Sequence, residues 1–234
     1  MDNSSAIARE TLPSPLWSSL SRRLRHRLSF GLISRSIHIG HKRQLRDVPI
    51  PPADIPISVR PLRDADLETL LPPDTSGLDE AERNEIETRR SFARRVPVGG
   101  WVAVDLRNGQ PCFMMWIIDH ANSNGVAQLE GTPRLRPHQI ATENVYVAPG
   151  YRGKRISTPA SLAAIEMARG DATEVIAFIG ETNLVSRQGA ARSGLTPYIR
   201  HVRWHLLFGL VHIDLFDRKL PSPLTATAPI AAKA

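Results

Sequence analysis

Short apolar runs alternate with polar, helix-like stretches between residues 57 and 216. Residues 57–62 alternate apolar and polar positions as a half-buried strand does, whereas 101–106, 112–119 and 174–180 are short apolar runs typical of buried strands. An Asn-Gly turn separates the first two of these runs and predicts a hairpin. Two further strands are expected in 199–216, so the pattern favours one α/β domain.

Four stretches between the predicted strands have helical character. Residues 63–71 carry acidic side chains in a first turn, and 78–96 are dense in Glu and Arg without Gly or Pro, which predicts a solvated surface helix. A third helix is expected at 157–171, and a short fourth one at 186–194. The polar residues 120–138 contain two glycines and two prolines and are expected to form a loop.

The N-terminal segment repeats leucine every fourth residue from Leu16 to Leu32, with four arginines between Arg22 and Arg27. This pattern predicts a basic amphipathic helix over 16–37. Three interpretations are open: contact with an anionic membrane surface, a helix packed on the body or mobile in solution, and a transit peptide. We expect an N-terminal segment at 1–46, a linker with four prolines at 47–56, the domain at 57–220 and a disordered tail at 221–234.

The net charge of +7 is concentrated in that N-terminal segment. Residues 1–46 hold nine Lys/Arg and two Asp/Glu, whereas 47–234 hold 21 of each. A neutral body argues against a nucleic-acid-binding domain, because such a domain carries its own basic face. Nucleic-acid binding by the basic N-terminal segment is a third functional hypothesis, which predicts an affinity that depends steeply on salt. The single cysteine, Cys112, cannot form an intramolecular disulfide, and no metal site is expected because Cys/His ligand spacings are absent. We expect a cytoplasmic protein, held at the membrane periphery if the N-terminal helix binds lipid.

The chemistry is concentrated in the stretch VYVAPGYRGKRIST at 145–158. An apolar strand ends in Pro-Gly, three cations follow, and a helix begins at the Ser/Thr pair. Free N–H groups and the helix dipole both favour an anion at such a helix start. Cys112, by contrast, follows a turn in a hairpin strand and is interpreted as a small core residue. The run Met114–Trp116 is expected in the core, with a surface for a lipid-like acceptor as the alternative.

The element order and this turn resemble the GNAT superfamily of acyl-CoA-dependent N-acetyltransferases. The resemblance implies a central mixed β-sheet flanked by helices, with splayed strands that form a coenzyme A cleft, and acetyl-CoA as co-substrate without a metal. Val147 and Pro149 match the strand end V-x-P. At the positions of the family's two loop glycines this chain has Arg155 and Ser157. Arg155 suits this position only if the backbone there avoids positive φ, and Ser157 could cap the helix. The resemblance implies that the pyrophosphate is bound by Arg152, Gly153, Lys154, Arg155, Ile156 and Ser157.

A second motif lies about 30 residues later, in ETNLVSRQGAARSGL. In the superfamily an Asn in this pattern lies beside the pantetheine arm, and Asn183 matches it. The pattern's Tyr, thought to protonate the leaving thiolate, is replaced by Ala190. A water molecule or Tyr198 would then do that work, or the thiolate leaves unassisted.

The resemblance implies an enzyme in which an amine attacks the thioester directly. Glu143 is the best-placed carboxylate for a general base, and a solvated or salt-bridged strand residue is the alternative interpretation. The family pattern also implies that the Val147 N–H binds the thioester carbonyl. The acceptor would be a small-molecule or peptide amine, with His120 and His138 bordering its pocket. A catalytically inactive binding or scaffold protein is the rival hypothesis.

Overall fold

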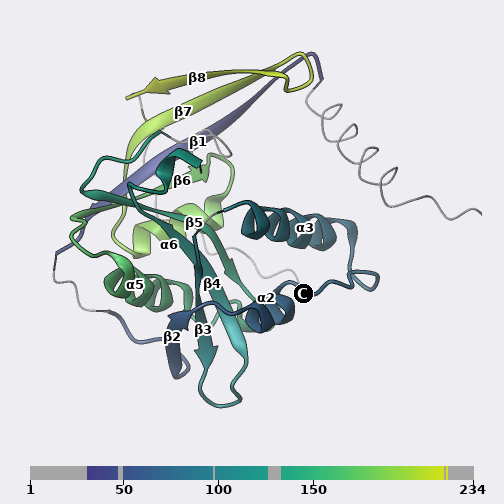
Figure 1. The fold of residues 1–234 in the computed structure, drawn as a ribbon, viewed down its shortest axis with the longest axis vertical. Helices are drawn as coiled ribbons and strands as arrows, with labels where there is room; N and C mark the ends of the chain where they lie inside the picture. The colour runs from purple at the N-terminus through teal and green to yellow at the C-terminus, as the bar shows by residue number, and fades with distance from the viewer. Residues whose placement is uncertain (1–30, 47–49, 97, 126–132, 219, 221–234) are drawn as a thin grey trace, which may run out of the picture. The chain divides into compact units, whose positions relative to one another are not determined.

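The computed structural model describes residues 31–46, 50–96, 98–125, 133–218 and 220. Within these ranges helices and strands alternate as expected, and the mixed α/β class is confirmed (Figure 1). The elements are β1 (Ile33–Gln44), β2 (Ile57–Pro61), α2 (Asp64–Leu70), α3 (Glu80–Arg95), β3 (Gly100–Asp105), β4 (Pro111–Ile118), β5 (Gln139–Val147), the 3-10 helix η1 (Pro149–Tyr151), α5 (Ser157–Ala168), β6 (Glu174–Gly180), α6 (Leu184–Arg192), β7 (Thr196–Leu206) and β8 (Val211–Asp217).

The strands form one eight-stranded sheet in the order β2-β3-β4-β5-β6-β1-β7-β8. Strands β2 to β5 pair antiparallel, β5 and β6 pair parallel, and β6 pairs antiparallel with β1. By its contacts the chain divides into two compact units, which we call the hairpin unit (up to Ser36, with Val202–Leu215) and the main unit (Ile37–His201 and from Phe216 on). Strands β1 and β7 each run from one unit into the other.

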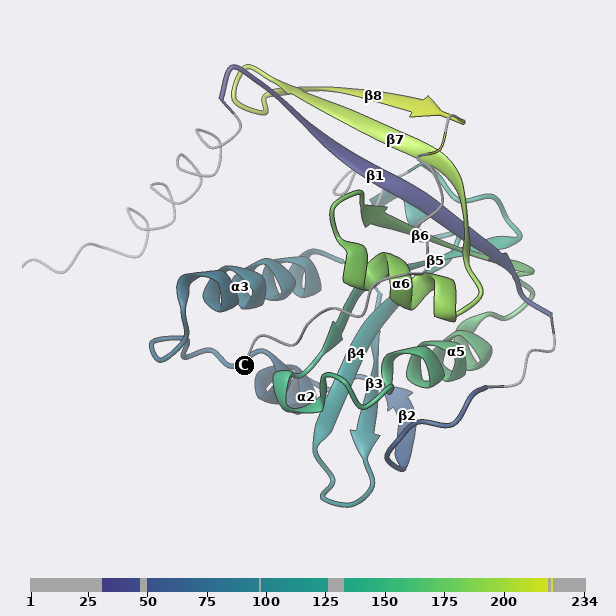
Figure 2. The ribbon, with the colours of Figure 1, turned by 180° about the vertical axis from the view of Figure 1, so that it is seen from behind.

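Strand β4 is the centre of the main unit, because its apolar run is buried on both faces. Met114 and Trp116 join the cluster packed against α2 and α3, whereas Phe113 and Met115 join the cluster packed against α5. The alternation of strand side chains explains how a continuous apolar run serves two helix layers, which Figures 1 and 2 show on opposite sides of the sheet. The core interpretation of Met114–Trp116 is therefore confirmed.

Strand β1 was not expected from the sequence pattern. Residues 33–37, included in the helix predicted for 16–37, form the start of this strand; the rest of that helix up to residue 30 lies outside the described residues. In the main unit β1 pairs with β6 from His38↔Gly180 to Gln44↔Glu174. Gly40 has no room for a side chain, because an added Cβ would lie 2.6 Å from Ile199 Cγ2. Glycine at this position lets β1 fit closely against its neighbours.

No helix in the described ranges is long and apolar enough to cross a membrane.

Candidate functional site

The parallel strands β5 and β6 separate partway along their length. They pair only at Gln139↔Glu174, Ile140↔Val175 and Ala141↔Ile176. Beyond this point β5 continues to Val147 alongside β4, and β6 continues to Gly180 alongside β1. The carboxyl ends of two adjacent parallel strands thus diverge, and such a divergence is where open α/β sheets bind ligands.

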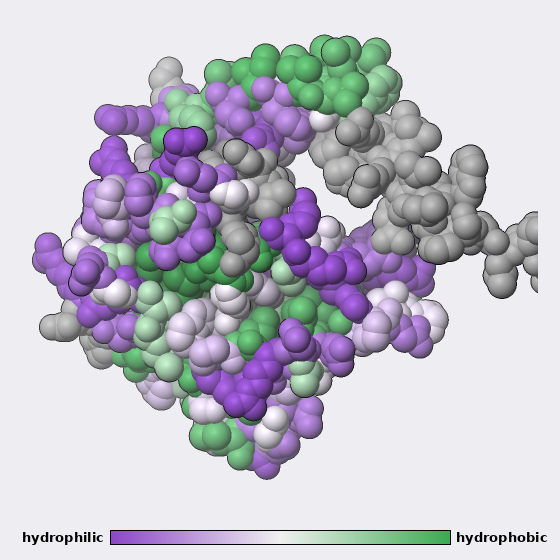
Figure 3. Space-filling view, viewed as in Figure 1, coloured by the Kyte–Doolittle hydropathy of each residue, from purple (hydrophilic) through white to green (hydrophobic). Residues whose placement is uncertain are grey.

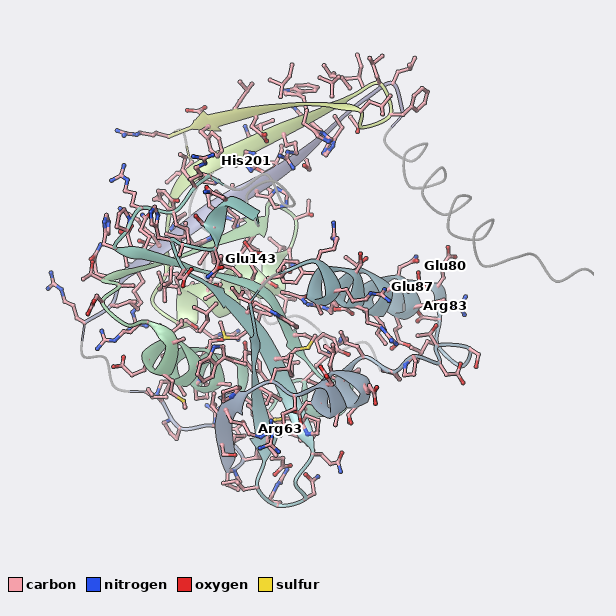
Figure 4. The ribbon with its side chains drawn as sticks, in the orientation of Figure 1. Arg63, Glu80, Arg83, Glu87, Glu143 and His201 are labelled. Atoms are coloured by element: carbon pink, nitrogen blue, oxygen red, sulfur yellow. The ribbon has the colours of Figure 1, made fainter. Side chains whose placement is uncertain are left out.

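A small pocket lies at this divergence and contains the predicted base. Glu143 is partly buried on β5, and Figure 4 labels it there. Most of the surrounding side chains are apolar, with one hydroxyl. The pocket is lined by Ile118, Ser123, Pro133, Leu135, Ala141, Glu143, Ile176 and Phe178. Pro133 and Leu135 belong to the loop predicted at 120–138, so this loop borders the carboxylate.

A β-bulge changes the direction of β5 next to Glu143. Trp116 pairs with Glu143 and Met114 with Tyr146, so Asn144 and Val145 together oppose a single residue of β4. Asn144 has φ 50°, a left-handed conformation that asparagine tolerates better than most residues. Bulges of this kind change the direction of side chains and occur frequently beside active sites.

Arg89 on α3 holds the bulge in place. Its guanidinium donates to Asn144 Oδ1 at 2.9 Å and to the Val145 carbonyl at 3.0 Å. Two further bonds reach Glu85 Oε1, one turn earlier on α3. The same guanidinium lies 4.7 Å from the centre of the Tyr146 ring. Arg89 therefore joins α3 to the bulge through both backbone and side-chain contacts.

The sequence analysis missed this residue. It interpreted 78–96 as a solvated surface helix, but α3 buries Ile86 and Phe92, and Phe92 packs edge-on against Trp116 at 5.6 Å. The Glu85–Arg89 spacing was visible as an i,i+4 pair, which is equally common on exposed helices. No signal in the sequence distinguished the arginine that binds the bulge from its neighbours.

The Val147 N–H points into the gap between β5 and β6. The next N–H along the chain, that of Ala148, donates to the Cys112 carbonyl of β4 at 3.0 Å. Successive N–H groups of a strand point to opposite edges, so the Val147 N–H faces away from β4. This is the side on which a carbonyl between the strands would lie.

The basic turn after β5 has two residues with positive φ. Gly153 has φ 83° and Arg155 has φ 46°, so the condition that Arg155 avoid this region is not met. The guanidinium of Arg155 instead makes a bidentate contact with Asp54, at 2.6 Å and 2.9 Å to Oδ1. The Asp54 N–H also donates to the Lys154 carbonyl at 3.3 Å. These contacts hold the strained backbone and lower the pKa of the Asp54 carboxyl, mainly through the Arg155 hydrogen bond.

Several backbone N–H groups of the turn have no hydrogen-bond acceptor in the part of the chain that the structure describes. Those of Gly153, Arg155 and Ile156 donate to no acceptor within the described ranges. Helix α5 begins at Ser157 with Ile156 as its N-cap and without a side-chain cap, so Ser157 does not cap the helix as the sequence suggested. N–H groups at a helix start and the helix dipole favour a phosphate there.

The side chains of Arg152 and Lys154 are the cations of the turn that do not contact the Asp54 carboxylate. Arg152 is half exposed, and with the described residues its side chain makes only long contacts, 3.4 Å to the Val147 carbonyl and 3.5 Å to Glu85 Oε2. The Lys154 ammonium lies 4.8 Å from the centre of the Tyr151 ring. Both side chains can reorient towards a phosphate at little cost, because the contacts they would give up are weak.

Asn183 and Tyr198 have structural partners. Asn183 is the N-cap of α6, where its Oδ1 accepts from the Ser186 N–H at 3.1 Å. Tyr198 packs edge-on against Phe178, a residue of the Glu143 pocket, at 6.4 Å. Burial raises the pKa of Tyr198 to about 12, so this phenol donates a proton poorly at neutral pH.

His120, His138 and Cys112 make contacts within the fold. His120 Nδ1 lies 2.6 Å from the Leu135 carbonyl, and the His138 carbonyl accepts from the Thr173 and Glu174 N–H groups. Cys112 is fully buried, and burial raises the pKa of its thiol to about 11, which does not suit a nucleophile.

No group of metal ligands occurs among the described residues. A hollow of about 580 Å³ lies between residues 50–59 and α5, but it contains none of the predicted site residues.

No protein-family model and no curated protein matches the sequence. Similar solved structures include GNAT acetyltransferases, the superfamily whose motifs the sequence resembles. One is a tandem GNAT protein from the clavulanic acid biosynthesis pathway, at 18% identity and TM-score 0.48 over 83% of this chain and 61% of that one. Another is a putative GNAT-family acetyltransferase from Novosphingobium aromaticivorans, at 12% identity and TM-score 0.43 over 74% of this chain and 66% of that one. A third is the GCN5-related glucosamine N-acetyltransferase region of a fungal multi-domain β-N-acetylglucosaminidase. Its sequence identity is 14% and its TM-score 0.48, over 78% of this chain and 22% of that one.

The chain spans about three fifths of the tandem protein. The identities and TM-scores are low, so the assignment of the site rests on this chain's own geometry.

Proposed function

We propose that the protein is an acyl-CoA-dependent N-acyltransferase, which in its simplest form transfers an acetyl group from acetyl-CoA to a primary amine. The observation that carries the proposal is the end of β5–β6 pairing at Ala141↔Ile176, with Glu143 and the Val147 N–H beyond it and the basic turn after β5. A thioester between the strands and a pyrophosphate at the turn would use both features. The protein's cytoplasmic location is part of the same proposal.

Each part of the site has one role in the reaction. The N–H groups of the turn and the α5 start bind the pyrophosphate, with added charge from Arg152 and Lys154. Arg155 acts indirectly, since its bond to Asp54 keeps the turn in its left-handed shape. Asn183 borders the pantetheine arm at the start of α6.

The chemical step is a direct attack. The amine lone pair forms the new bond to the thioester carbonyl carbon while Glu143 accepts the amine proton. The Val147 N–H stabilises the negative charge on the carbonyl oxygen. The C–S bond then breaks with its electron pair on sulfur and coenzyme A leaves as the thiolate, because Ala190 offers no proton and the raised pKa of Tyr198 makes its phenol a poor acid. Glu143 afterwards releases the amine proton to solvent.

Calorimetric titration with acetyl-CoA and desulfo-CoA tests the binding part. We expect micromolar binding by the wild-type protein and a loss of roughly tenfold or more for Arg152→Ala, because a charge-assisted contact to phosphate is removed. Arg192→Ala is the matched control, an exposed arginine at the last turn of α6. Unchanged affinity in Arg152→Ala would remove this arginine from the phosphate site, and no binding by the folded wild type would end the proposal.

A second candidate is a GNAT-like binding or scaffold protein without catalysis, which the replacement of the motif's Tyr by Ala190 favours. It predicts coenzyme A binding without release of free thiol in the presence of amines. The acceptor screen should cover small-molecule amines and peptide amines, because the loop at 120–138 that borders Glu143 is where the acceptor would bind.

A further inference from the structure

The turn that joins β7 to β8 consists of apolar residues. Residues 206–211 read LLFGLV, without a polar side chain. The Leu207 N–H donates to the Leu32 carbonyl at 2.9 Å and the Phe208 N–H to the Gly31 carbonyl at 3.0 Å, so the residues before β1 lie beside the turn. We call residues 31–33 and 206–211 the hairpin tip; all of them belong to the hairpin unit.

The hairpin tip displays its apolar side chains to solvent. Leu32 and Ile33 are 63% and 68% exposed, and Leu207 and Leu210 are 55% and 59% exposed. Figure 3 shows strongly hydrophobic surface over this turn. The exposed apolar surface continues along β8 through Val211, Ile213 and Leu215. Contiguous apolar surface of this kind marks a binding site for another molecule or a membrane.

The turn keeps these side chains although they do not suit its backbone. Leu207, Phe208 and Gly209 follow one another at φ 51°, 59° and 73°, and the Leu210 N–H donates to the Leu206 carbonyl at 3.1 Å. Asn, Asp and Gly are the residues that hairpin turns with positive φ prefer. Leu207 and Phe208 are both disfavoured by this backbone, and Leu207 is also exposed to water. Strain of this kind is found where a side chain is needed for function.

The charge of the adjacent chain indicates the binding partner. Arg27 precedes Gly31 by four residues, which allows at most about 14 Å of extended chain, and Arg22 precedes it by nine, at most about 32 Å. The length of the chain therefore keeps all four arginines within about 32 Å of Gly31. A second copy of this chain would bring the same positive charge, which opposes self-association there. An anionic bilayer complements both the arginines and the apolar turn.

We infer that the hairpin tip inserts its exposed Leu and Ile side chains into the interface of an anionic phospholipid membrane, which the positive charge of Arg22, Arg23, Arg25 and Arg27 attracts. This inference extends the membrane interpretation of the N-terminal segment to an element at the other end of the sequence. It is independent of acyl transfer, because it uses no residue of the β5–β6 site.

Vesicle flotation of the full-length protein tests the inference. The probes are phosphatidylcholine vesicles with and without roughly 30% phosphatidylserine. We expect binding to the anionic vesicles alone. The double variant Leu207→Asn/Phe208→Asn should lower the partition coefficient roughly tenfold or more, because the inserted apolar surface is lost. The hairpin should remain folded, since Asn accepts positive φ and precedes Gly209 as hairpin turns prefer. Replacing the four arginines by Gln should also lower binding.

The matched control is Leu106→Asn, which removes an equally exposed leucine, at 61%, from the main unit. It should leave vesicle binding unchanged. The inference is overturned if the double variant binds like the wild type, or if the wild type ignores anionic vesicles. A wild-type dimer that the double variant converts to a monomer, without vesicle binding, would also overturn it and assign the tip to a second copy.

Discussion

The charged residues of the site differ in what the sequence could reveal about them. The arginines and lysine of the turn were visible as a cluster, and their position at a helix start followed from the local pattern. Their partners were not visible, because Arg155 binds Asp54 101 residues earlier in the chain. Glu143 was selected from its strand position, and the structure adds a mostly apolar pocket around it. Local chemistry was thus predictable, and long-range pairing was not.

Glu143→Gln tests the base directly. The amide keeps the shape of the side chain but cannot accept the amine proton, so kcat should fall by about 10²-fold or more while acetyl-CoA affinity stays within about twofold. Steady-state kinetics and calorimetry measure the two quantities separately. Glu166→Gln on α5, which removes an exposed glutamate paired with Arg169, should change neither. An undiminished kcat would exclude Glu143 as the base.

Cys112 leads to a prediction about pH. Burial raises the pKa of its thiol from 9.0 to about 11, so the folded protein holds this proton more tightly than the unfolded chain does. The associated stability is present below pH 9 and is lost as the pH rises towards 11. Urea unfolding between pH 8 and 11 should show this loss, and Cys112→Ala should reduce it; Tyr198, whose pKa is raised from 10.0 to about 12, contributes to the loss above pH 10 in both proteins. The thiol should also resist alkylation at pH 8 until the protein is unfolded, and fast native alkylation would show that it is accessible.

At the scale of elements, most helices and strands could be predicted because their periodicity is local. The exceptions are informative. Helix α3 has the composition of a surface helix, yet it holds the bulge that separates Glu143 from Val147. The bulge itself left no trace in the sequence, because Asn144 and Val145 continue an ordinary strand pattern. Bulges depend on the register with β4, which only the folded sheet defines.

Arg89→Ala should release the bulge. Loss of hydrogen bonds from a charged group should lower the free energy of unfolding by about 1.5–3 kcal/mol. If Arg89 positions Glu143, kcat should fall more than acetyl-CoA binding does, and Arg89→Lys should restore little, because an ammonium cannot reproduce the forked contact. Arg83→Ala, on the same helix and bonded to the Leu78 carbonyl, is the control. Reduced stability with unchanged kinetics would leave Arg89 a purely structural role.

At the scale of the whole molecule, the sheet includes a strand that the predicted domain boundary at residue 57 omits. Serines, histidines and a glycine interrupt the apolar alternation in 33–44. The leucines that recur every fourth residue up to Leu32 also favour a helix that continues into this segment. Residues distant in sequence hold β1 in the sheet. It pairs with β6 through the backbone, and the Arg43 side chain donates to the Ser193 carbonyl. Neither partner could be inferred from local pattern.

The contribution of β1 to the stability of the domain can be tested by truncation. A chain of residues 31–220 should fold like the full-length protein, whereas 50–220 should be unstable or insoluble, because removal of β1 exposes the β6 edge and the core beside Ile39, a fully buried residue. Thermal melting and amide exchange of the two chains measure this. Gly40→Val in the full-length protein should also lower the melting temperature, since the added Cβ would lie 2.6 Å from Ile199 Cγ2. Ser34→Val, a strand substitution in the hairpin unit, is its control. Equal melting of 50–220 and 31–220 would show that the domain begins after the linker and that β1 is an accessory strand.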